Sequence, residues 1–219
     1  MSGAQSLLVV FVSIRTIVLA ETVDSRSVTS TRDRILDASA ELFGRQGYHG
    51  TGVKALAGRA DAQLASLYHF FPGGKQELAA VSIVRAGAFY QDVVTEVIDG
   101  EPDIVTGLEA MFAGAAATLE ATDYADACPI ETIALEVAST DEVLRQATAD
   151  VFASWIDAAS ERLVAGGLMP AAARSLAIAA ICALEGAFVL SRAARTTEAL
   201  EAAGAATVAA LRASLDATE

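Results

Sequence analysis

The chain has 219 residues, of which 53% are hydrophobic and 20% are charged. This length suits one or two domains with a buried core, and this composition excludes a disordered acidic chain. The net charge of −13 is spread unevenly, because residues 29–75 hold six Lys or Arg against four Asp or Glu, whereas residues 76–219 hold seven against 22. The first of these segments can approach a polyanion, which the rest of the chain would repel.

The N-terminal residues contain an apolar run, Leu7–Leu19, that is interrupted by Arg15. This run is shorter than the roughly 20 residues that cross a bilayer. No Lys or Arg precedes Arg15, although a signal peptide has a basic start. We therefore expect residues 1–28 to be an extension outside the fold, and a signal or anchor role is the alternative.

The first helix of the fold is expected to begin after Ser30. The pattern Ser30-x-x-Asp33 is typical of a capping box, in which the two side chains satisfy free amides of the first turn. Apolar residues then recur at helical spacing as far as Phe43. Gly47 is expected to end this helix with a left-handed backbone.

Two shorter helices are expected next. Thr51 is predicted to cap the first of them with its side chain. Asp61 lies in a tight break that requires a left-handed backbone, which Asp adopts at some cost. The second short helix is predicted to end at the turn Pro72-Gly73-Gly74.

Helical patterns continue to the end of the chain, and no segment keeps the alternation of a β-strand. The remaining helices are expected at about 75–98, 104–121, 129–138, 140–166, 170–195 and 197–215. The sequence therefore predicts an all-α protein with about nine helices. Its N-terminal domain, residues 29–89, would be a three-helix helix-turn-helix domain, and residues 90–219 would form a C-terminal helical domain.

The first three helices have the dimensions of a helix-turn-helix module, at roughly 18, 9 and 8 residues with a tight turn between the last two. A short third helix fits the DNA major groove, which is about 12 Å wide. Leu64, Leu67 and Phe71 are expected to point inward from it. The opposite face would show polar and aromatic side chains, which can reach base edges and phosphates: Gln63, Ser66, Tyr68, His69 and Phe70.

Two stretches of the chain resemble the DNA-binding region of the TetR/AcrR family of bacterial transcriptional regulators, TRDRILDASAELFGRQGYHGTGVKALAGRA and SLYHFFPGGKQEL. The segments FPGGK and CPIETIALE, at residues 71–75 and 128–136, are similar to the LmrA/YxaF branch of that family. The matching positions of the first region are Thr31, Arg32, Ile35, Leu36, Ala38, Leu42, Phe43, Gly47, Tyr48, Thr51, Val53, Ala57, Ala60, Leu67, Tyr68, Phe71 and Lys75.

The resemblance implies a cytoplasmic homodimeric repressor that has no enzymatic activity, no cofactor and no membrane partner. Such a protein binds double-stranded operator DNA and releases it when a small-molecule inducer enters the C-terminal domain. The resemblance also implies that Thr51 touches phosphate and that Lys75 holds the DNA backbone. The residues that would face the groove and its walls are Gln63, Ser66, Tyr68 and His69. Further DNA contacts are expected from Arg26, Arg32 and Arg34.

The C-terminal helices offer apolar bulk for a ligand and small residues for a dimer. Because few polar residues lie among the large side chains, we expect an apolar or aromatic ligand. An ordinary core without a cavity explains each of these side chains equally well. Small residues at 170–195 and 197–215 would let two copies pack as a four-helix interface, and the helix at 75–98 is the expected transmitter between domains. The residues predicted to line the pocket are Phe89, Met111, Phe112, Tyr124, Phe152, Trp155 and Phe188.

Two other functions remain open from the sequence. A helical ligand carrier with a degenerate helix-turn-helix is suggested by Asp61 and Leu64, where the family usually has Gly and a cation. An all-α enzyme is disfavoured, since no carboxylate pair with an adjacent base and no phosphate-binding glycine loop occurs. Cys128 and Cys182 lack metal-ligand spacing and are interpreted as reduced thiols. With two histidines in the chain, no metal site is expected.

Overall fold

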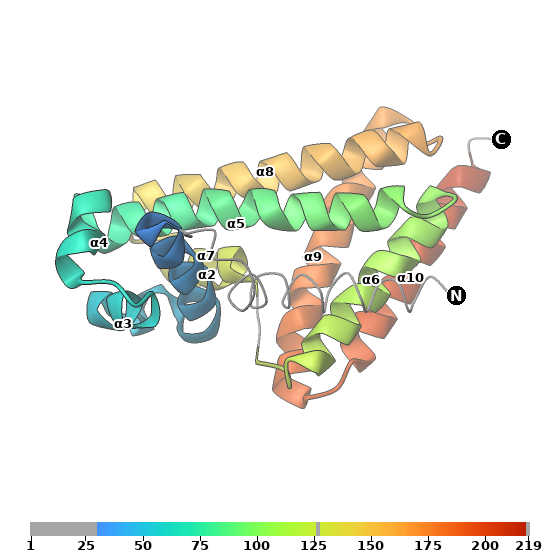
Figure 1. Ribbon diagram of the computed structural model, residues 1–219. Helices are drawn as coiled ribbons and strands as arrows, with labels where there is room; N and C mark the ends of the chain where they lie inside the picture. The colour runs from blue at the N-terminus through green and yellow to red at the C-terminus, as the bar shows by residue number, and fades with distance from the viewer. Residues whose placement is uncertain (1–29, 126–127, 218–219) are drawn as a thin grey trace. The chain divides into compact units, whose positions relative to one another are not determined.

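The computed structural model describes residues 30–125 and 128–217, so the predicted extension at 1–28 and its Arg26 lie outside the described residues. The described residues form helices without strands, and Figure 1 shows their order. This confirms the predicted all-α fold. The helices are α2 (Thr31–Gly50), α3 (Val53–Arg59), α4 (Leu64–Phe70), α5 (Gly74–Asp99), α6 (Ile104–Ala121), α7 (Pro129–Val137), α8 (Glu142–Ala165), α9 (Pro170–Ala194) and α10 (Glu198–Asp216).

The described chain packs as two compact units. The N-terminal unit consists of residues 30–90 and 128–153, and the C-terminal unit of residues 91–125 and 154–217. The segment at 128–153 therefore packs with the first three helices, although it follows the last of them by more than 50 residues in the chain. The domain division at residue 89 stays a prediction, because compactness does not decide which segments act together.

The first helix of the N-terminal unit begins as its sequence predicts. Ser30 is the N-cap of α2, and its hydroxyl accepts a hydrogen bond from the Asp33 amide at 3.1 Å. The Ser30 hydroxyl in turn donates to the Asp33 carboxylate at 2.6 Å. In a capping box the Asp33 carboxylate would accept from the Ser30 amide, whereas here it accepts from the Ser30 hydroxyl. Gly47 has the predicted left-handed backbone, with φ 74° and ψ 173°.

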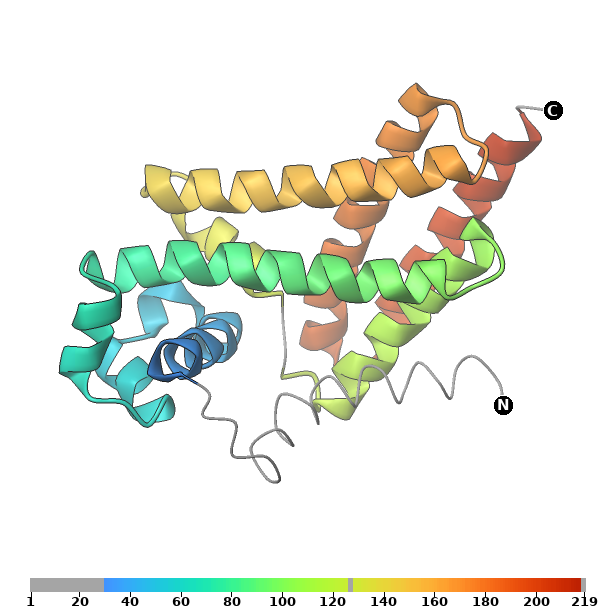
Figure 2. The same cartoon turned by 45° about the horizontal axis from the view of Figure 1, so that its top comes forward.

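The core of the N-terminal unit is built from large apolar side chains of six helices, α2 to α5, α7 and the first part of α8. α3 and α4 are short helices that pack on α2 and on each other (Figure 2). α7 also packs on α2, and it does so through an apolar face at helical spacing, because Ile130, Ile133 and Val137 are at most 1% exposed. The other fully buried side chains include Ile35, Phe43, Leu56, Leu67, Phe71 and Leu78.

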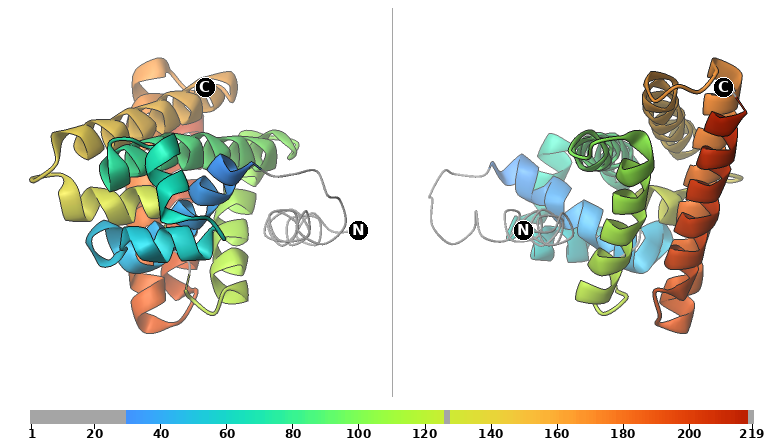
Figure 3. Two further views of the ribbon diagram at one scale, coloured as in Figure 1. Left: turned by 60° about the vertical axis from the view of Figure 1, so that its left-hand side comes forward. Right: turned by 90° about the vertical axis from the view of Figure 1, so that its right-hand side faces the viewer.

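The C-terminal unit is organised around α6, α9 and α10, which pack against one another and are seen from two further sides in Figure 3. Gly204 of α10 lies so close to α6 that an added Cβ would be 2.8 Å from the Cβ of Phe112. Glycine is therefore required there for the close approach of the two helices. Leu211 and Ala173 complete this core and are fully buried.

Length and composition alone would let two helices, α6 and α9, span a bilayer. Buried helices of globular domains can be equally long and equally apolar. Within the structure 44% of the α6 window and 28% of the α9 window are buried. The other residues of the α9 window are half-buried or exposed among the described residues.

Candidate nucleic-acid interface

A tight turn joins α3 to α4, and the sequence explains why it forms. Asp61 adopts the predicted left-handed backbone, with φ 46°, and the amide of Ala62 donates back to the carbonyl of Ala57 at 2.9 Å. Gln63 is the N-cap of α4 without a side-chain hydrogen bond, since Gln is a poor capping residue. α4 thus starts three residues after the left-handed residue that turns the chain.

Arg34 of α2 fastens this turn. Its Nε donates to the carbonyl of Ala60 at 3.0 Å, and its Nη2 donates to the carbonyl of Asp61 at 3.2 Å. The DNA contact that the resemblance implied for Arg34 stays a prediction. In the structure its guanidinium binds main-chain carbonyls that lie 26 and 27 residues further along the chain. The sequence offered no signal for this partner.

α4 presents one buried and one exposed face. Leu67 is fully buried, whereas Gln63, Tyr68 and His69 are exposed. Tyr68 is 48% exposed. The inward position predicted for Leu64 is wrong, since this residue is 37% exposed at the first position of the helix.

The other two residues predicted on the outer face, Ser66 and Phe70, are half-buried. They flank the exposed side chains at the edge of the α4 surface. Phe71, predicted to point inward, is 1% exposed. Tyr68 and His69 are thus the exposed polar side chains of α4 itself, and the exposed Gln63 is its N-cap.

The turn after α4 positions Tyr68. Gly74 begins α5 with a left-handed backbone, φ 67°, and an added Cβ there would lie 3.4 Å from Cε1 of Tyr68. The amide of Gly73 donates to the Glu77 carboxylate at 2.7 Å. The Pro-Gly-Gly turn predicted from sequence is thus a tightly fitted support for the tyrosine ring.

Cations border this surface. Arg32 is exposed at the start of α2, with its guanidinium carbon 5.6 Å from the centre of the Phe71 ring. Lys54 is exposed on α3. Arg59 is engaged in an ion pair with Glu41 at 2.6 Å. Arg32 and Lys54 are consequently placed to approach phosphate oxygens.

Thr51 and Lys75 have structural partners that differ from their predicted roles. The Thr51 side chain is fully buried, and its hydroxyl donates to the carbonyls of Leu42 and Gly47. Gly52 is the N-cap of α3, so the predicted capping role of Thr51 is wrong, while its predicted phosphate contact stays a prediction. Lys75 is half-buried, and its Nζ donates to the carbonyls of Tyr48 and Thr51 at 3.0 and 3.2 Å.

The residues predicted to line a ligand pocket fall into both compact units. Met111 and Phe112 belong to the core of α6, α9 and α10, while Tyr124 and Phe188 pack on a second small cluster around Leu119. Trp155 is half-buried in the same unit. The two residues that belong to the N-terminal unit are Phe89 and Phe152. The predicted pocket stays a prediction.

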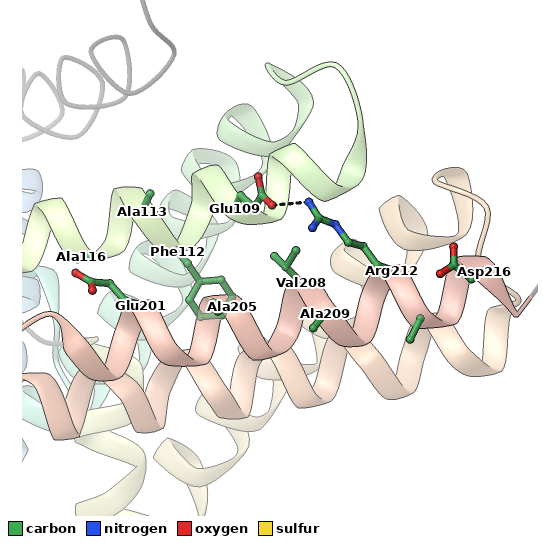
Figure 4. A pocket seen from close by; sticks show the side chains of 12 residues that line it. Glu109, Phe112, Ala113, Ala116, Glu201, Ala205, Val208, Ala209, Arg212 and Asp216 are labelled. Carbon is green, nitrogen blue, oxygen red and sulfur yellow. Dashed lines mark hydrogen bonds and ion pairs between the residues drawn. The ribbon is translucent and has the colours of Figure 1, made fainter.

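A groove runs along α6 and α10 in the C-terminal unit (Figure 4) and has a volume of about 740 Å³. Phe112 is the predicted pocket residue that lines it. Glu109 and Arg212 form an ion pair across the groove at 2.9 Å. Small side chains make most of the remaining lining: Ala113, Ala116, Gly204, Ala205, Ala209 and Ala213.

Metal and thiol chemistry have little support in the described part of the chain. Cys128 is half-buried and Cys182 is exposed. Among residues 30–125 and 128–217, no three His, Cys, Asp or Glu side chains gather as a metal site.

Comparison with known proteins gives two family matches. Residues 35–81 match the family described as bacterial regulatory proteins of the tetR family, and residues 104–206 match the C-terminal domain of LmrA/YxaF-like transcriptional regulators. The chain is 30% identical over 161 residues to the uncharacterized HTH-type transcriptional regulator YxaF of Bacillus subtilis, covering 74% of this chain and 84% of that protein. It is 26% identical to the HTH-type transcriptional regulator LmrA of Bacillus subtilis, covering 78% and 91%.

Solved structures share the fold. The chain resembles a TetR transcriptional regulator from Legionella pneumophila, with a TM-score of 0.70 and 21% identity over 83% of this chain and 97% of the other. It also resembles a regulatory protein TetR from Rhodobacter sphaeroides, with a TM-score of 0.73 and 17% identity over 82% and 98%. At these identities the likeness concerns the fold alone.

Proposed function

We propose, from the premise that this chain belongs to the LmrA/YxaF-like branch of the TetR family of bacterial transcriptional regulators, that it is a homodimeric repressor. It binds a palindromic operator in double-stranded DNA through α4 and acts in the cytoplasm. It leaves the operator when a small apolar or aromatic molecule binds its C-terminal segment.

One observation carries the DNA-binding role: the exposed face of α4. Tyr68 and His69 are exposed on a seven-residue helix whose N-cap is the exposed Gln63. Arg34 binds the turn before this helix, and Gly74 has a left-handed backbone in the turn after it. A single helix fits the major groove, and amide, hydroxyl and imidazole groups can hydrogen-bond base edges and phosphates. Rigid support lets these groups meet the bases without a further ordering cost.

A dimer would supply the affinity that one copy lacks. The segment at 29–75 has two more basic than acidic residues, and so small an excess neutralises few phosphates. Two copies related by a two-fold axis would place two α4 helices about 34 Å apart on successive turns of the duplex. The acidic remainder of the chain would keep other faces away from DNA.

The exposed face of α9 supports the dimer. Val189 is 46% and Leu190 63% exposed, and Cys182 and Gly186 are exposed on the same helix. An apolar face of this kind is normally covered. Small residues also allow helices of two copies to approach closely, as in a four-helix interface.

Induction requires that the ligand bind the DNA-incompetent arrangement more tightly, typically by about 1–3 kcal/mol of coupling. Its site would involve the apolar side chains of the C-terminal segment, among them Met111, Phe112, Tyr124, Trp155 and Phe188, together with Phe89 and Phe152. α5 contributes residues to both compact units, which supports it as a transmitter.

The DNA-binding role is tested by fluorescence anisotropy with the chain's own upstream intergenic DNA and a scrambled fragment of the same length. We expect wild type to prefer the upstream DNA. Tyr68→Ala should raise the Kd about tenfold or more, since one good contact to DNA is worth about 1–3 kcal/mol. Tyr90→Ala is the matched control, because Tyr90 is 38% exposed on α5, away from the helix-turn-helix.

Equal affinity of wild type for both fragments, or equal losses for the two tyrosine variants, would contradict the proposal. Absence of any binding by a folded dimer would favour a helical ligand carrier with a degenerate helix-turn-helix, the function that Asp61 and the exposed Leu64 would then explain.

A further inference from the structure

The last turn of α2 and the residue after it form a joint, defined here as residues 47–51, whose polar groups are bound from several sides. Gly47 breaks the helical run of α2 with its left-handed backbone. The carbonyl of Gly47 accepts from the Thr51 hydroxyl at 2.7 Å. Thr51 closes the turn with its amide, which donates to the carbonyl of Tyr48 at 3.3 Å.

Lys75 holds the carbonyl side of the joint. Its Nζ donates to the carbonyls of Tyr48 and Thr51 and lies 4.2 Å from the centre of the Tyr48 ring. The ammonium therefore makes two charge-assisted hydrogen bonds and a cation–π contact with the same short segment.

Glu136 of α7 holds the amide side of the joint. Its Oε1 accepts from the Tyr48 amide at 3.1 Å, and its Oε2 accepts from the His49 amide at 2.7 Å. Oε2 also lies 2.9 Å from Nδ1 of His49. A carboxylate that accepts from two successive main-chain amides fixes the orientation of both peptide planes.

Gly47 is fitted to this carboxylate. A Cβ added at Gly47 would lie 1.6 Å from Oε1 of Glu136, closer than any two non-bonded atoms. The position therefore requires glycine for two independent reasons, its positive φ and the space that the Glu136 carboxylate occupies. The joint and α7 are complementary in shape as well as in hydrogen bonding.

α7 does not belong to the helix-turn-helix in sequence. Glu136 lies 87 residues beyond His49, inside the segment at 104–206 that matches the LmrA/YxaF-like C-terminal domain. α7 nevertheless packs on α2 within the N-terminal unit. The side chain of Glu136 is 29% exposed, so its carboxylate is held at the joint at the edge of that packed surface.

We propose that Glu136 is a positioning residue through which the C-terminal segment controls the helix-turn-helix. By binding the amides of Tyr48 and His49 it sets the direction in which the chain leaves α2, and hence the placement of α3, which begins at Val53, and of α4 behind it. A shift of α7 that withdraws the carboxylate would release the joint and lower DNA affinity. This inference rests on the proposed DNA-binding function.

The test compares Glu136→Ala with wild type by amide hydrogen exchange and by anisotropy with the upstream DNA, at a temperature where circular dichroism shows both to be folded. We expect the amides of Tyr48 and His49 to exchange about tenfold faster or more once their acceptor is gone, with exchange at Phe43 unchanged. We expect the Kd for DNA to rise about tenfold, as for loss of a charged hydrogen bond. Glu161→Gln, an exposed glutamate on α8, is the control for lost charge and should behave as wild type.

Two further variants separate positioning from plain stabilisation. His49→Ala keeps both main-chain donors, so we expect less than about a twofold change in Kd. Glu136→Gln retains the shape but presents an NH₂ group to one of the two amides, and its affinity should fall between wild type and Glu136→Ala. A lower unfolding midpoint in Glu136→Ala with unchanged Kd, or a loss in His49→Ala as large as in Glu136→Ala, would overturn the proposal.

The outcomes distinguish this proposal from the DNA-binding function. If wild type binds the upstream DNA and Glu136→Ala binds it equally well, the positioning role falls and the repressor function stands. If wild type does not bind that DNA, the repressor function falls. Hydrogen exchange still tests the contact between the Glu136 carboxylate and the two amides, because unchanged exchange at Tyr48 and His49 in Glu136→Ala would overturn it.

Discussion

At the scale of single residues, the two lysines of the chain have opposite environments. Lys75 donates to two main-chain carbonyls, whereas Lys54 is exposed on α3. We expect Lys75→Met to lower the free energy of unfolding by about 1–3 kcal/mol, because hydrogen bonds made by a charged group are lost. Urea denaturation of each variant measures this.

Lys54→Met is the matched control for that loss. It should change the unfolding free energy by less than about 0.5 kcal/mol and instead reduce the salt dependence of DNA binding by about one ion. Equal destabilisation by the two substitutions would show that the Lys75 contacts do not stabilise the joint.

Asp61 places a negative charge in the turn before α4, the helix proposed to read DNA. Asp61→Asn keeps a side chain that tolerates the left-handed backbone and removes this charge. We expect a Kd for the upstream DNA that is lower by about threefold at 50 mM salt, with the gain shrinking at 200 mM as charge is screened. An affinity gain that does not depend on salt would contradict an electrostatic cause.

Local chemistry decided which residue roles could be predicted. The cap at Ser30 and the left-handed backbones at Gly47 and Asp61 follow from neighbouring residues, and the structure has them. The partners of Arg34 and Lys75 lie 24 to 27 residues away in the sequence. These structural partners depend on tertiary packing, and the DNA contacts that the resemblance implies for the two residues stay predictions.

At the scale of elements, α9 carries a glycine, Gly186, that no close packing among the described residues requires. Gly186 is exposed, and a Cβ added there would meet nothing within 4 Å, while glycine in a helix costs about 1 kcal/mol relative to alanine. Close approach of a second copy would explain it. We expect Gly186→Phe to yield a folded monomer in multi-angle light scattering.

Gly186→Ala is the companion variant, since alanine adds one methyl group to the same position. It should raise the unfolding midpoint and leave the dimer intact or weakened slightly. A dimer of unchanged stability in Gly186→Phe would place the interface elsewhere than on this face of α9.

Element positions were predicted more accurately than element packing. Pro129 and the breaks around Gly100 and Gly166 delimit α5 to α8 in the sequence, and the observed bounds agree within a few residues. That α7 packs on α2 could not be predicted, because amphipathic spacing shows that a helix has a buried face without showing which helix covers it. Glu136 was therefore missed as a site residue, although its segment was singled out for its likeness to one branch of the family.

At the scale of the whole molecule, the uneven distribution of charge along the sequence indicates which part of the chain can approach DNA. The excess of acidic residues lies beyond residue 75, and the exposed face of α4 lies before it. The family matches cover both parts of the chain. A ligand site depends on cavities that only three-dimensional packing creates, and the aromatic residues proposed for it are shared between two compact units.

The central claim is that two copies of α4 read one operator together. A DNase I footprint over the upstream intergenic DNA tests it most directly. We expect protection of two related half-sites with centres about 10–10.5 base pairs apart, one helical turn, at roughly 0.1 μM protein, and loss of both in Tyr68→Ala. A single protected half-site, or protection that Tyr68→Ala leaves unchanged, would contradict the claim.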